Sequence, residues 1–154
     1  MKIRKALLVD LENILKLSGE LFEYEKQFTP YFNKNWTRSD HGRKFFEKRL
    51  SEQDSICLIA EEKRKILGYM ITHIVNFPFR KPSKIANIAN MFIIKEFRSK
   101  GLGTKMIEET IKLLKQRAIK RIRVEAISKN TEAIDFYKTF GFEDFEIILE
   151  SNLL

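Results

Sequence analysis

The stretch that decides the fold is Met91-Phe92-Ile93-Ile94-Lys95-Glu96-Phe97-Arg98-Ser99-Lys100-Gly101-Leu102-Gly103-Thr104. Its apolar start is typical of a strand, and its end opens a helix. Gly101 and Gly103 allow the backbone to take unusual dihedral angles and to approach a ligand closely. The first N–H groups of a helix lack internal partners, and the helix dipole favours an anion there. With Arg98 and Lys100 adding positive charge, this stretch predicts a pyrophosphate site.

Two better-known phosphate motifs do not fit this stretch. A Walker A loop needs Gly-Lys-Ser/Thr, whereas Gly103-Thr104-Lys105 has another order. A dinucleotide fingerprint needs a third Gly or Ala where Met106 stands. The remaining pattern is Arg-x-x-Gly-x-Gly before a helix. The alternative is a plain helix start that happens to contain two flexible glycines.

Hydrophobic periodicity places this stretch within a regular succession of elements. Strands are expected at 3–6, 55–60, 66–75, 85–94, 121–127 and 142–149, and helices at 11–22, 40–50, 101–120 and 131–139. The long helix between strands 85–94 and 121–127 implies a right-handed crossover with parallel pairing. The expected fold class is α/β, an α+β mixed sheet with helices on both faces.

Length and composition restrict the class of protein. The 154 residues are expected to form one domain spanning 1–154, and one Cys excludes an intramolecular disulfide. One Cys and two His cannot supply the usual ligands of a structural zinc site, so no metal is expected. Apolar runs stop at about four residues, which excludes a transmembrane helix. Asp10 and Glu12 interrupt the apolar stretch that a signal peptide needs, so we expect a cytoplasmic protein.

The net charge of +8 is unevenly distributed. Residues 91–123 hold ten Lys and Arg against three acids, whereas residues 124–154 hold two against seven. This pattern could place an anion and a cation in neighbouring sites. Solvated helix faces explain it equally well, and a basic nucleic-acid-binding module is a further alternative. No recognised nucleic-acid motif is present, so a nucleic acid partner is not expected.

A second motif follows thirty-two residues after Arg98, at the end of the next expected strand. It comprises Asn130-Thr131-Glu132-Ala133-Ile134-Asp135-Phe136-Tyr137 and closes with Gly141-Phe142. Together with the Arg98–Gly103 pattern, at a spacing that fits one helix and one strand, it resembles the GNAT superfamily of acetyl-CoA-dependent N-acetyltransferases. The expected element order fits that fold over nearly the whole chain.

The resemblance implies a binding site for acetyl-CoA. Backbone N–H groups after the Arg would hold the pyrophosphate, and the strand before it would line the pantetheine arm. An N–H of Phe92 or Ile93 would polarise the thioester carbonyl, as an oxyanion hole does. The matching residues are Phe92, Ile93, Ile94, Arg98, Ser99, Lys100, Gly101, Leu102, Gly103, Thr104, Asn130, Ala133 and Tyr137. A cap of the following helix is an alternative role for Asn130.

The resemblance also implies catalytic residues. Tyr137 matches the general acid that protonates the departing thiolate, with a core tyrosine as the alternative. Glu125 resembles the base that some relatives use, and a solvent-facing glutamate paired with Lys or Arg is the alternative. His73 is another base by its chemistry. Asn87 and Asn90 stand where some relatives carry a base, but amides can only orient water or substrate.

The acceptor side would be formed by the first two helices and the middle strands. We expect Glu23, Tyr24, Phe28 and Asn90 to bind the acceptor, with Glu20, Glu25, Tyr31, Phe32 and Trp36 nearby. Carboxylates and aromatic rings suit a cationic amine. The amine could be a polyamine or other small amine, an aminoglycoside or a protein amine.

The expected partners are therefore acetyl-CoA and this amine, without a membrane. A homodimer could form through the 77–83 loop or the last strand. A catalytically silent CoA-binding regulator is the other alternative function.

Overall fold

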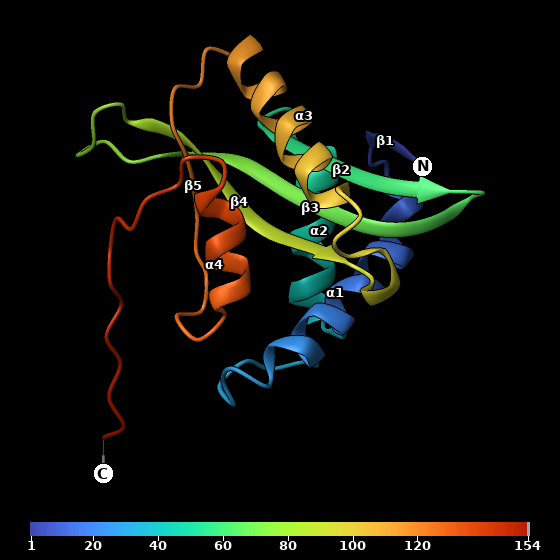
Figure 1. Ribbon diagram of the computed structural model, residues 1–154, viewed down its shortest axis with the longest axis horizontal. Coiled ribbons are helices and arrows are strands. Elements are labelled where there is room, and N and C mark those ends of the chain that lie inside the picture. Colours follow the sequence, from blue (N-terminus) through green and yellow to red (C-terminus); the bar gives the residue numbers. More distant parts are fainter. Residues whose placement is uncertain (154) are drawn as a thin grey trace.

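The computed structural model describes residues 1–153 and arranges five strands in one sheet (Figure 1). The strands follow the order β1-β2-β3-β4-β5, with bounds β1 Lys2–Lys5, β2 Ser55–Glu62, β3 Lys65–Asn76, β4 Lys84–Ile93 and β5 Ile122–Val124. Neighbours among β1 to β4 pair antiparallel, and β5 pairs parallel to β4. The mixed sheet expected from the sequence is confirmed.

Helices cover both faces of this sheet. They are α1 Leu11–Glu25, α2 Asp40–Ser51, α3 Leu102–Gln116 and α4 Thr131–Lys138. Figure 1 shows α1 and α2 on one side of the sheet and α3 on the other. Residues Ser55–Ala60 of β2 are therefore buried without interruption, as in a strand covered on both faces. None of the helices within residues 1–153 is both long and apolar enough to span a membrane.

The core fixes the helices against the middle strands. Ser39 begins α2 as its N-cap, with its hydroxyl oxygen accepting the Gly42 N–H at 3.1 Å. One turn later the fully buried Phe46 packs its ring against Tyr69 of β3, with centroids 6.1 Å apart. On the opposite face Met106 and Ile107 of α3 are fully buried. Both faces of the sheet are thus closed by tightly packed apolar side chains.

The predicted last strand, 142–149, is wrong for the isolated chain. Residues 142–153 form neither helix nor strand and extend away from the sheet beside α4 (Figure 1). Ile147 and Leu149 expose 84% and 88% of their surface. The side chains have the composition of a strand, but a strand also needs a neighbour to accept and donate its backbone hydrogen bonds. We call residues 143–153 the C-terminal arm.

Two other predicted elements are shorter than expected. Helix α3 ends at Gln116 rather than at residue 120, because Ala118 takes a left-handed conformation with φ of 57°. Its N–H donates to Lys115 O and the Ile119 N–H donates to Leu114 O, which closes the helix in a Schellman-type turn. Strand β5 covers Ile122–Val124 instead of 121–127, because its pairing with β4 stops there.

A partly buried ion pair joins β1 to the start of α1. The two guanidinium N–H groups of Arg4 each donate to a different carboxylate oxygen of Asp10, both at 2.9 Å. One of these oxygens also accepts the Leu7 N–H at 2.8 Å. Asp10 is buried, and the bonds from Arg4 hold the pKa of its carboxyl below its ordinary value.

Asp10→Asn should lower the free energy of unfolding by about 2 kcal/mol at pH 7, because Arg4 loses the bidentate carboxylate and keeps only Glu61 as a charged partner. A depressed folded-state pKa gives stability that is present above the unfolded-state pKa and lost as pH falls through the folded-state value. The deficit of the variant should therefore shrink below about pH 4. Urea unfolding at several pH values measures it.

Glu12→Gln is the matched control, because its pair with Arg43 is exposed and solvent screens it. This control should unfold at nearly the same urea concentration as the parent. An equal deficit of Asp10→Asn at pH 3 and pH 7 would contradict the role given to the ion pair.

Candidate active site

Strands β4 and β5 are paired over a short length only. The pairing runs from Ala86 opposite Ile122 to Ile88 opposite Val124, and the Ala86 N–H donates to Arg121 O at 2.9 Å. Strand β4 continues to Ile93 beyond this point. Its edge on the β5 side therefore has no strand partner in residues 89–93 within the described chain.

Alternation along β4 decides which backbone groups face this unpaired edge. The Ile94 N–H donates to Leu67 O at 2.9 Å, and the register with β3 is regular from Asn90 to Ile93. In an antiparallel ladder, N–H and C=O groups of successive residues point to opposite edges. Those of Met91 and Ile93 therefore point away from β3, toward the unpaired edge, while those of Phe92 point into the ladder.

The loop after β4 leads into α3 through two residues in the left-handed conformation. Ser99 and Gly101 have positive φ of 58° and 77°, and Gly101 is the N-cap of α3 without a side-chain cap. The first bond back to the cap runs from the Lys105 N–H to Gly101 O. The N–H groups of residues 102–104 therefore precede the helical ladder, as the sequence predicts. A Cβ on Gly101 would meet no atom within 4 Å, so this helix start is open to a ligand.

Arg98 fixes this loop to the sheet and to α1. Its Nε donates to Ile93 O at 2.8 Å, and its guanidinium carbon lies 4.5 Å from the ring centre of Tyr24 and 5.1 Å from that of Phe92. Cation–π contact and the hydrogen bond hold the side chain beside β4. Its charge thus lies at the carboxyl end of β4, close to the loop amides.

Gly103 permits a close approach of α4 to α3. A Cβ at this position would lie 2.9 Å from Cε of Met91 and 3.0 Å from Cζ of Phe136. Such distances are shorter than normal carbon contacts. The second glycine of the motif is thus required by packing, whereas the first is required by the turn.

Tyr137 of α4 directs its hydroxyl at β4. The hydroxyl lies 3.8 Å from Sδ of Met91, and the ring packs against Phe136 and Phe142. Burial raises the pKa of Tyr137 to about 12, so the hydroxyl keeps its proton at neutral pH. A proton donor therefore lies beside the unpaired edge of β4.

Asn130 caps the helix that carries Tyr137. Its Oδ1 accepts the Ala133 N–H at 3.2 Å, which is the capping role considered for it from the sequence. The cap fixes the first turn of α4 and thereby the position of Ala133, which lies in that turn.

Glu125 lies just after β5, in an exposed position. Its side chain is 66% exposed and pairs with Arg123 at 3.0 Å. Arg123 also donates from Nε to Oδ1 of Asn87 at 2.9 Å, so the amide oxygen of Asn87 already has a hydrogen-bond donor.

His73 lies away from Glu125, in a polar cavity of about 520 Å³ beside Arg49, where burial lowers the pKa of its imidazole. Within residues 1–153 no group of three or more His, Cys, Asp or Glu side chains is suited to hold a metal ion.

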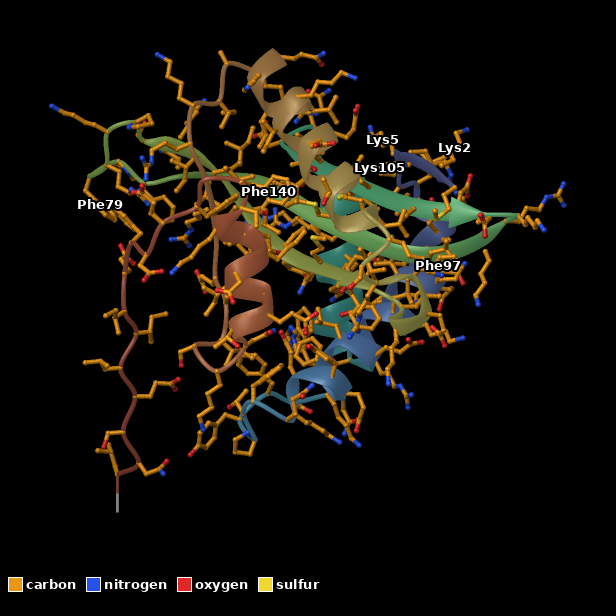
Figure 2. All side chains as sticks on the ribbon, in the orientation of Figure 1. Lys2, Lys5, Phe79, Phe97, Lys105 and Phe140 are labelled. Carbon is orange, nitrogen blue, oxygen red and sulfur yellow. The ribbon has the colours of Figure 1, made fainter. Side chains whose placement is uncertain are left out.

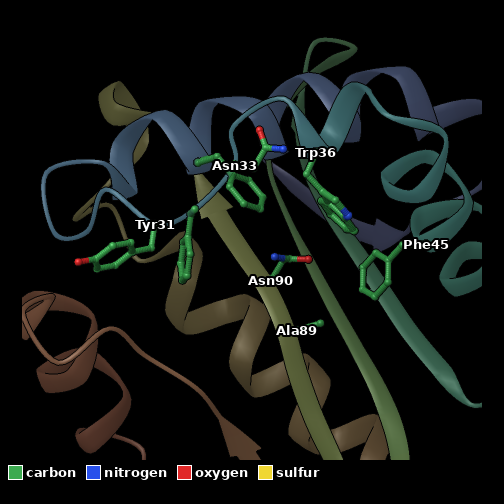
Figure 3. Close-up of a pocket in the computed structure, with 8 residues that line it drawn as sticks. Tyr31, Asn33, Trp36, Phe45, Ala89 and Asn90 are labelled. Atoms are coloured by element: carbon green, nitrogen blue, oxygen red, sulfur yellow. The ribbon is translucent and has the colours of Figure 1, made fainter. Parts of the chain in front are cut away.

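An aromatic pocket of about 410 Å³ opens on the α1–α2 side of β4 (Figure 3). It is lined by Phe22, Tyr31, Phe32, Asn33, Trp36, Phe45, Ala89 and Asn90. A register shift between Ile71 and Thr72 leaves Ala89 as an extra residue in β4, and such a bulge re-aims the neighbouring side chains. Of the residues expected on the acceptor side, Asn90, Tyr31, Phe32 and Trp36 line this pocket.

The other predicted acceptor residues lie outside the lining of this pocket. Glu23 is exposed and pairs with Lys26 at 2.9 Å and with Lys34 at 3.8 Å. Tyr24 packs on Phe28, with ring centres 5.5 Å apart, and beneath the Arg98 guanidinium. These residues shape the neighbouring end of α1.

Glu25, which the sequence places near the acceptor, becomes a candidate base only in the tertiary structure. It is partly exposed in the last turn of α1, where the helix dipole disfavours a negative charge. Burial raises the pKa of its carboxyl to about 7. A carboxyl that exchanges its proton near neutral pH is typical of functional sites, and its desolvation becomes visible only in the tertiary structure.

The sequence of this chain is similar to those of known acetyltransferases. The family model described as Acetyltransferase (GNAT) family matches residues 21–142. An uncharacterised N-acetyltransferase of Methanocaldococcus jannaschii is 25% identical over 95% of this chain, which spans 62% of that relative's length. The thialysine N-epsilon-acetyltransferase of Sus scrofa is 25% identical over 92% of this chain and 84% of its own. The spermidine N(1)-acetyltransferase of Thermoplasma acidophilum is 22% identical over 93% and 88%.

Solved structures show the same fold. A single-site mutant of a Bacillus halodurans protein superposes with a TM-score of 0.86 at 24% identity, covering all of both chains. A predicted acetyltransferase of Clostridium acetobutylicum, crystallised with acetyl-CoA, gives 0.78 at 22% identity and covers 98% of this chain and 95% of its own. At these identities the likeness concerns the fold.

Gly103→Ala should destabilise the protein by about 1–3 kcal/mol, because the added methyl overpacks the contact with Met91 and Phe136. Urea unfolding measures the loss. The double variant with Met91→Ala should recover part of it, since the crowding atom is gone.

Gly101→Ala is the control, because its cost comes from the positive φ and not from a neighbour. It should show no coupling to Met91→Ala. Additive effects for Gly103→Ala would refute the close-packing explanation.

Proposed function

The chain belongs to the acetyltransferase (GNAT) family, and from this premise we propose that it transfers the acetyl group of acetyl-CoA to a primary amine. Both substrates would be bound together, and the amine would attack directly. Three features that lie around the same end of the sheet support this proposal. They are the open amides at the start of α3, the unpaired edge of β4 and the buried Tyr137 hydroxyl.

The start of α3 is suited to hold the pyrophosphate of acetyl-CoA. Amides without helical partners, the helix dipole and the side chain of Lys100 all favour an anion there. The left-handed Gly101, with open space around it, leaves room for such a group to approach the backbone. We therefore assign this contact to Arg98, Ser99, Lys100, Gly101, Leu102, Gly103 and Thr104, with Arg98 holding the loop to Ile93 O.

The unpaired edge of β4 would receive the pantetheine arm and the thioester. The backbone of Ile93 faces this edge, Phe92 and Ile94 would flank the bound arm, and Asn130 and Ala133 would contact it from the start of α4. Between the two oxyanion donors considered, the alternation of β4 favours Ile93, because its N–H points to this edge. That N–H would stabilise the negative charge that develops on the carbonyl oxygen.

Tyr137 would act as the general acid. As the amine nitrogen bonds to the carbonyl carbon, the carbon–sulfur bond breaks and the sulfur leaves as a thiolate. Tyr137 can give its proton to that sulfur, since its pKa of about 12 keeps it protonated until then. The burial of its hydroxyl beside Met91 of β4 supports this role.

Two carboxylates are candidates for the base that takes the proton of the incoming ammonium group. Glu125 follows β5, but it is exposed and paired with Arg123. Glu25 lies at the end of α1, next to the Tyr24–Arg98 contact, and its pKa of about 7 suits proton exchange at neutral pH. The raised pKa favours Glu25, and the two assignments predict different pH profiles.

The aromatic pocket is the proposed acceptor site. Its aromatic rings offer π faces to a cation, and Asn90 and Asn33 offer amide oxygens that can accept its N–H groups. We propose as acceptor a small primary amine on an alkyl chain, the class to which the thialysine and spermidine of the named relatives belong.

The reaction would take place within one domain comprising residues 1–154. We place this domain in the cytoplasm, since the free Cys57 needs no oxidising compartment.

Calorimetric titration should show micromolar binding of acetyl-CoA, with no matching binding of ATP or of a short DNA duplex. An amine panel of thialysine, spermidine, lysine and an aminoglycoside, read by thiol release, then identifies the acceptor. Salt-sensitive DNA binding without acetyl-CoA binding would favour the nucleic-acid-binding alternative. Tight acetyl-CoA binding with no thiol release for any amine would favour a silent regulator.

Tyr137→Phe should lower kcat by about 10- to 100-fold, because a thiolate is a fairly good leaving group and needs only modest help. The KM for acetyl-CoA should stay the same, since the ring remains. Steady-state kinetics of thiol release measure both values. Unchanged turnover would remove the general-acid assignment.

Glu25→Gln should remove the limb of the kcat/KM profile that has an apparent pKa near 7, and lower the plateau about 100-fold or more. Glu125→Gln is the matched variant, and should keep that limb. The reverse result would transfer the role of base to Glu125. The profile is measured by thiol release between pH 5.5 and 9, about the range that brackets this pKa.

A further inference from the structure

The wall of the aromatic pocket is a series of rings that contact one another. The ring centres of Phe32 and Phe22 lie 6.2 Å apart, and those of Phe22 and Trp36 lie 6.0 Å apart. The Trp36 and Phe45 rings follow with a separation of 5.6 Å. The three pairs are inclined by 62°, 38° and 59°, so none is stacked face to face. Ring faces therefore stay available to a group that enters the pocket.

The lining of this pocket carries no charged side chain. Its polar side chains are those of Asn33, Asn90 and Tyr31. Arg49 lies behind the wall, in the neighbouring polar cavity, with its guanidinium carbon 5.2 Å from the ring centre of Phe45. Its charge is compensated by Glu52, whose carboxylate accepts a hydrogen bond from it at 2.7 Å. Selection of a cation must therefore come from ring faces and not from a carboxylate.

Such a lining distinguishes between two kinds of ammonium group. A primary ammonium group is strongly hydrated, and its three N–H groups need oxygen acceptors when it leaves water. A trimethylated ammonium group has no N–H, and its positively polarised methyl groups can pack directly on ring faces. Aromatic walls are accordingly typical of sites for quaternary and methylated ammonium ligands. The pocket is thus better suited to an alkylated nitrogen than to a primary one.

The Trp36 and Phe45 end of the pocket lies on the β3 side of β4. Both rings pack against Phe46, with ring centres 6.3 Å and 5.2 Å away. Phe46 in turn packs on Tyr69 of β3. The edge of β4 assigned to the thioester faces β5, on the opposite side of this strand. This end of the pocket is therefore separated from the proposed site of acetyl transfer.

An acceptor that occupies both places must span β4 with two groups. Figure 3 shows Trp36 and Phe45 on one side of Asn90, and Tyr31 on the other. Asn90 also precedes Ile93, the proposed oxyanion donor, by three residues, or about 10 Å of strand. The group bound in the pocket is thus about one short alkyl chain away from the nitrogen that is acetylated.

We propose that the aromatic pocket binds an alkylated ammonium group at the non-reacting end of the acceptor, whose other end carries the primary amine. Trp36 and Phe45 would contact the methyl groups, and Asn90 would accept an N–H of the primary amine. A quaternary nitrogen has no lone pair, so only the primary amine can form the new bond to the acetyl carbon as the carbon–sulfur bond breaks. The identity of the acceptor rests on the proposed function, whereas the ammonium site does not.

Fluorescence of Trp36, the single tryptophan of the chain, reports on the pocket without acetyl-CoA. Titration with tetramethylammonium chloride should change this fluorescence until it saturates, whereas ammonium chloride at equal ionic strength should have no such effect. The neutral alcohol tert-butanol has a similar shape and lacks the charge. It should therefore bind about 10-fold more weakly than tetramethylammonium.

Phe45→Leu removes one ring face and keeps the tryptophan reporter. It should weaken tetramethylammonium binding about 5-fold or more, and change tert-butanol binding little. Phe45→Tyr, which keeps a ring face, should bind as the parent does, and urea unfolding checks that both variants are folded. Phe79→Leu is the matched control, because this ring is 85% exposed in the loop between β3 and β4, outside the pocket (Figure 2). It should leave tetramethylammonium binding unchanged.

Thiol release with two forms of one diamine then tests the acceptor. Cadaverine trimethylated at one nitrogen should have a KM about 10-fold below that of unmodified cadaverine, because the pocket holds its alkylated end. Phe45→Leu should remove this preference, and Phe79→Leu should keep it.

No saturable response to tetramethylammonium, equal binding of tert-butanol, or full affinity in folded Phe45→Leu would overturn the ammonium site. Turnover with the same KM for both forms of cadaverine would overturn the inference about the acceptor and leave the proposed function standing. A pocket that binds tetramethylammonium in a protein that does not bind acetyl-CoA would refute the function and leave the ammonium site standing.

Discussion

Backbone groups without internal partners are the constraint on which the rest of this structure depends. They occur at the unpaired edge of β4 and in the first turn of α3, where a helix cannot satisfy its own N–H groups. The sheet brings both sets to one end of the molecule. Arg98 holds the loop between them to Ile93, and Gly103 lets α4 approach until Tyr137 reaches Met91. Each of these contacts keeps the open backbone groups directed at the same space.

The proposed chemistry uses two groups whose proton affinities burial has shifted. Apolar surroundings keep the Tyr137 hydroxyl protonated. Loss of water raises the pKa of the Glu25 carboxyl to about 7, close to physiological pH. A desolvated carboxyl without a counter-ion weakens the fold as pH rises through its pKa, unlike Asp10, which Arg4 stabilises. The contrast between these two carboxyls separates a structural pair from a group available to exchange a proton.

The aromatic pocket takes its lining from elements far apart in the sequence. Phe22 comes from α1, Phe45 from α2, and Ala89 and Asn90 from β4. The bulge of β4 places Ala89 as an extra residue directly before Asn90. The donor side is thus built from local motifs, whereas the acceptor side is assembled from elements far apart in the sequence.

The sequence by itself determined the element order, the mixed sheet, the left-handed glycine turn before α3 and the positions of Asn130 and Tyr137. These follow from periodicity and turn chemistry, which act over a few residues. Tertiary structure alone decided where β5 ends, which carboxyl is desolvated, that Glu23 and Tyr24 lie outside the pocket, and that the 142–149 strand has no partner. Burial and strand pairing depend on residues distant in the chain, so no local pattern can report them.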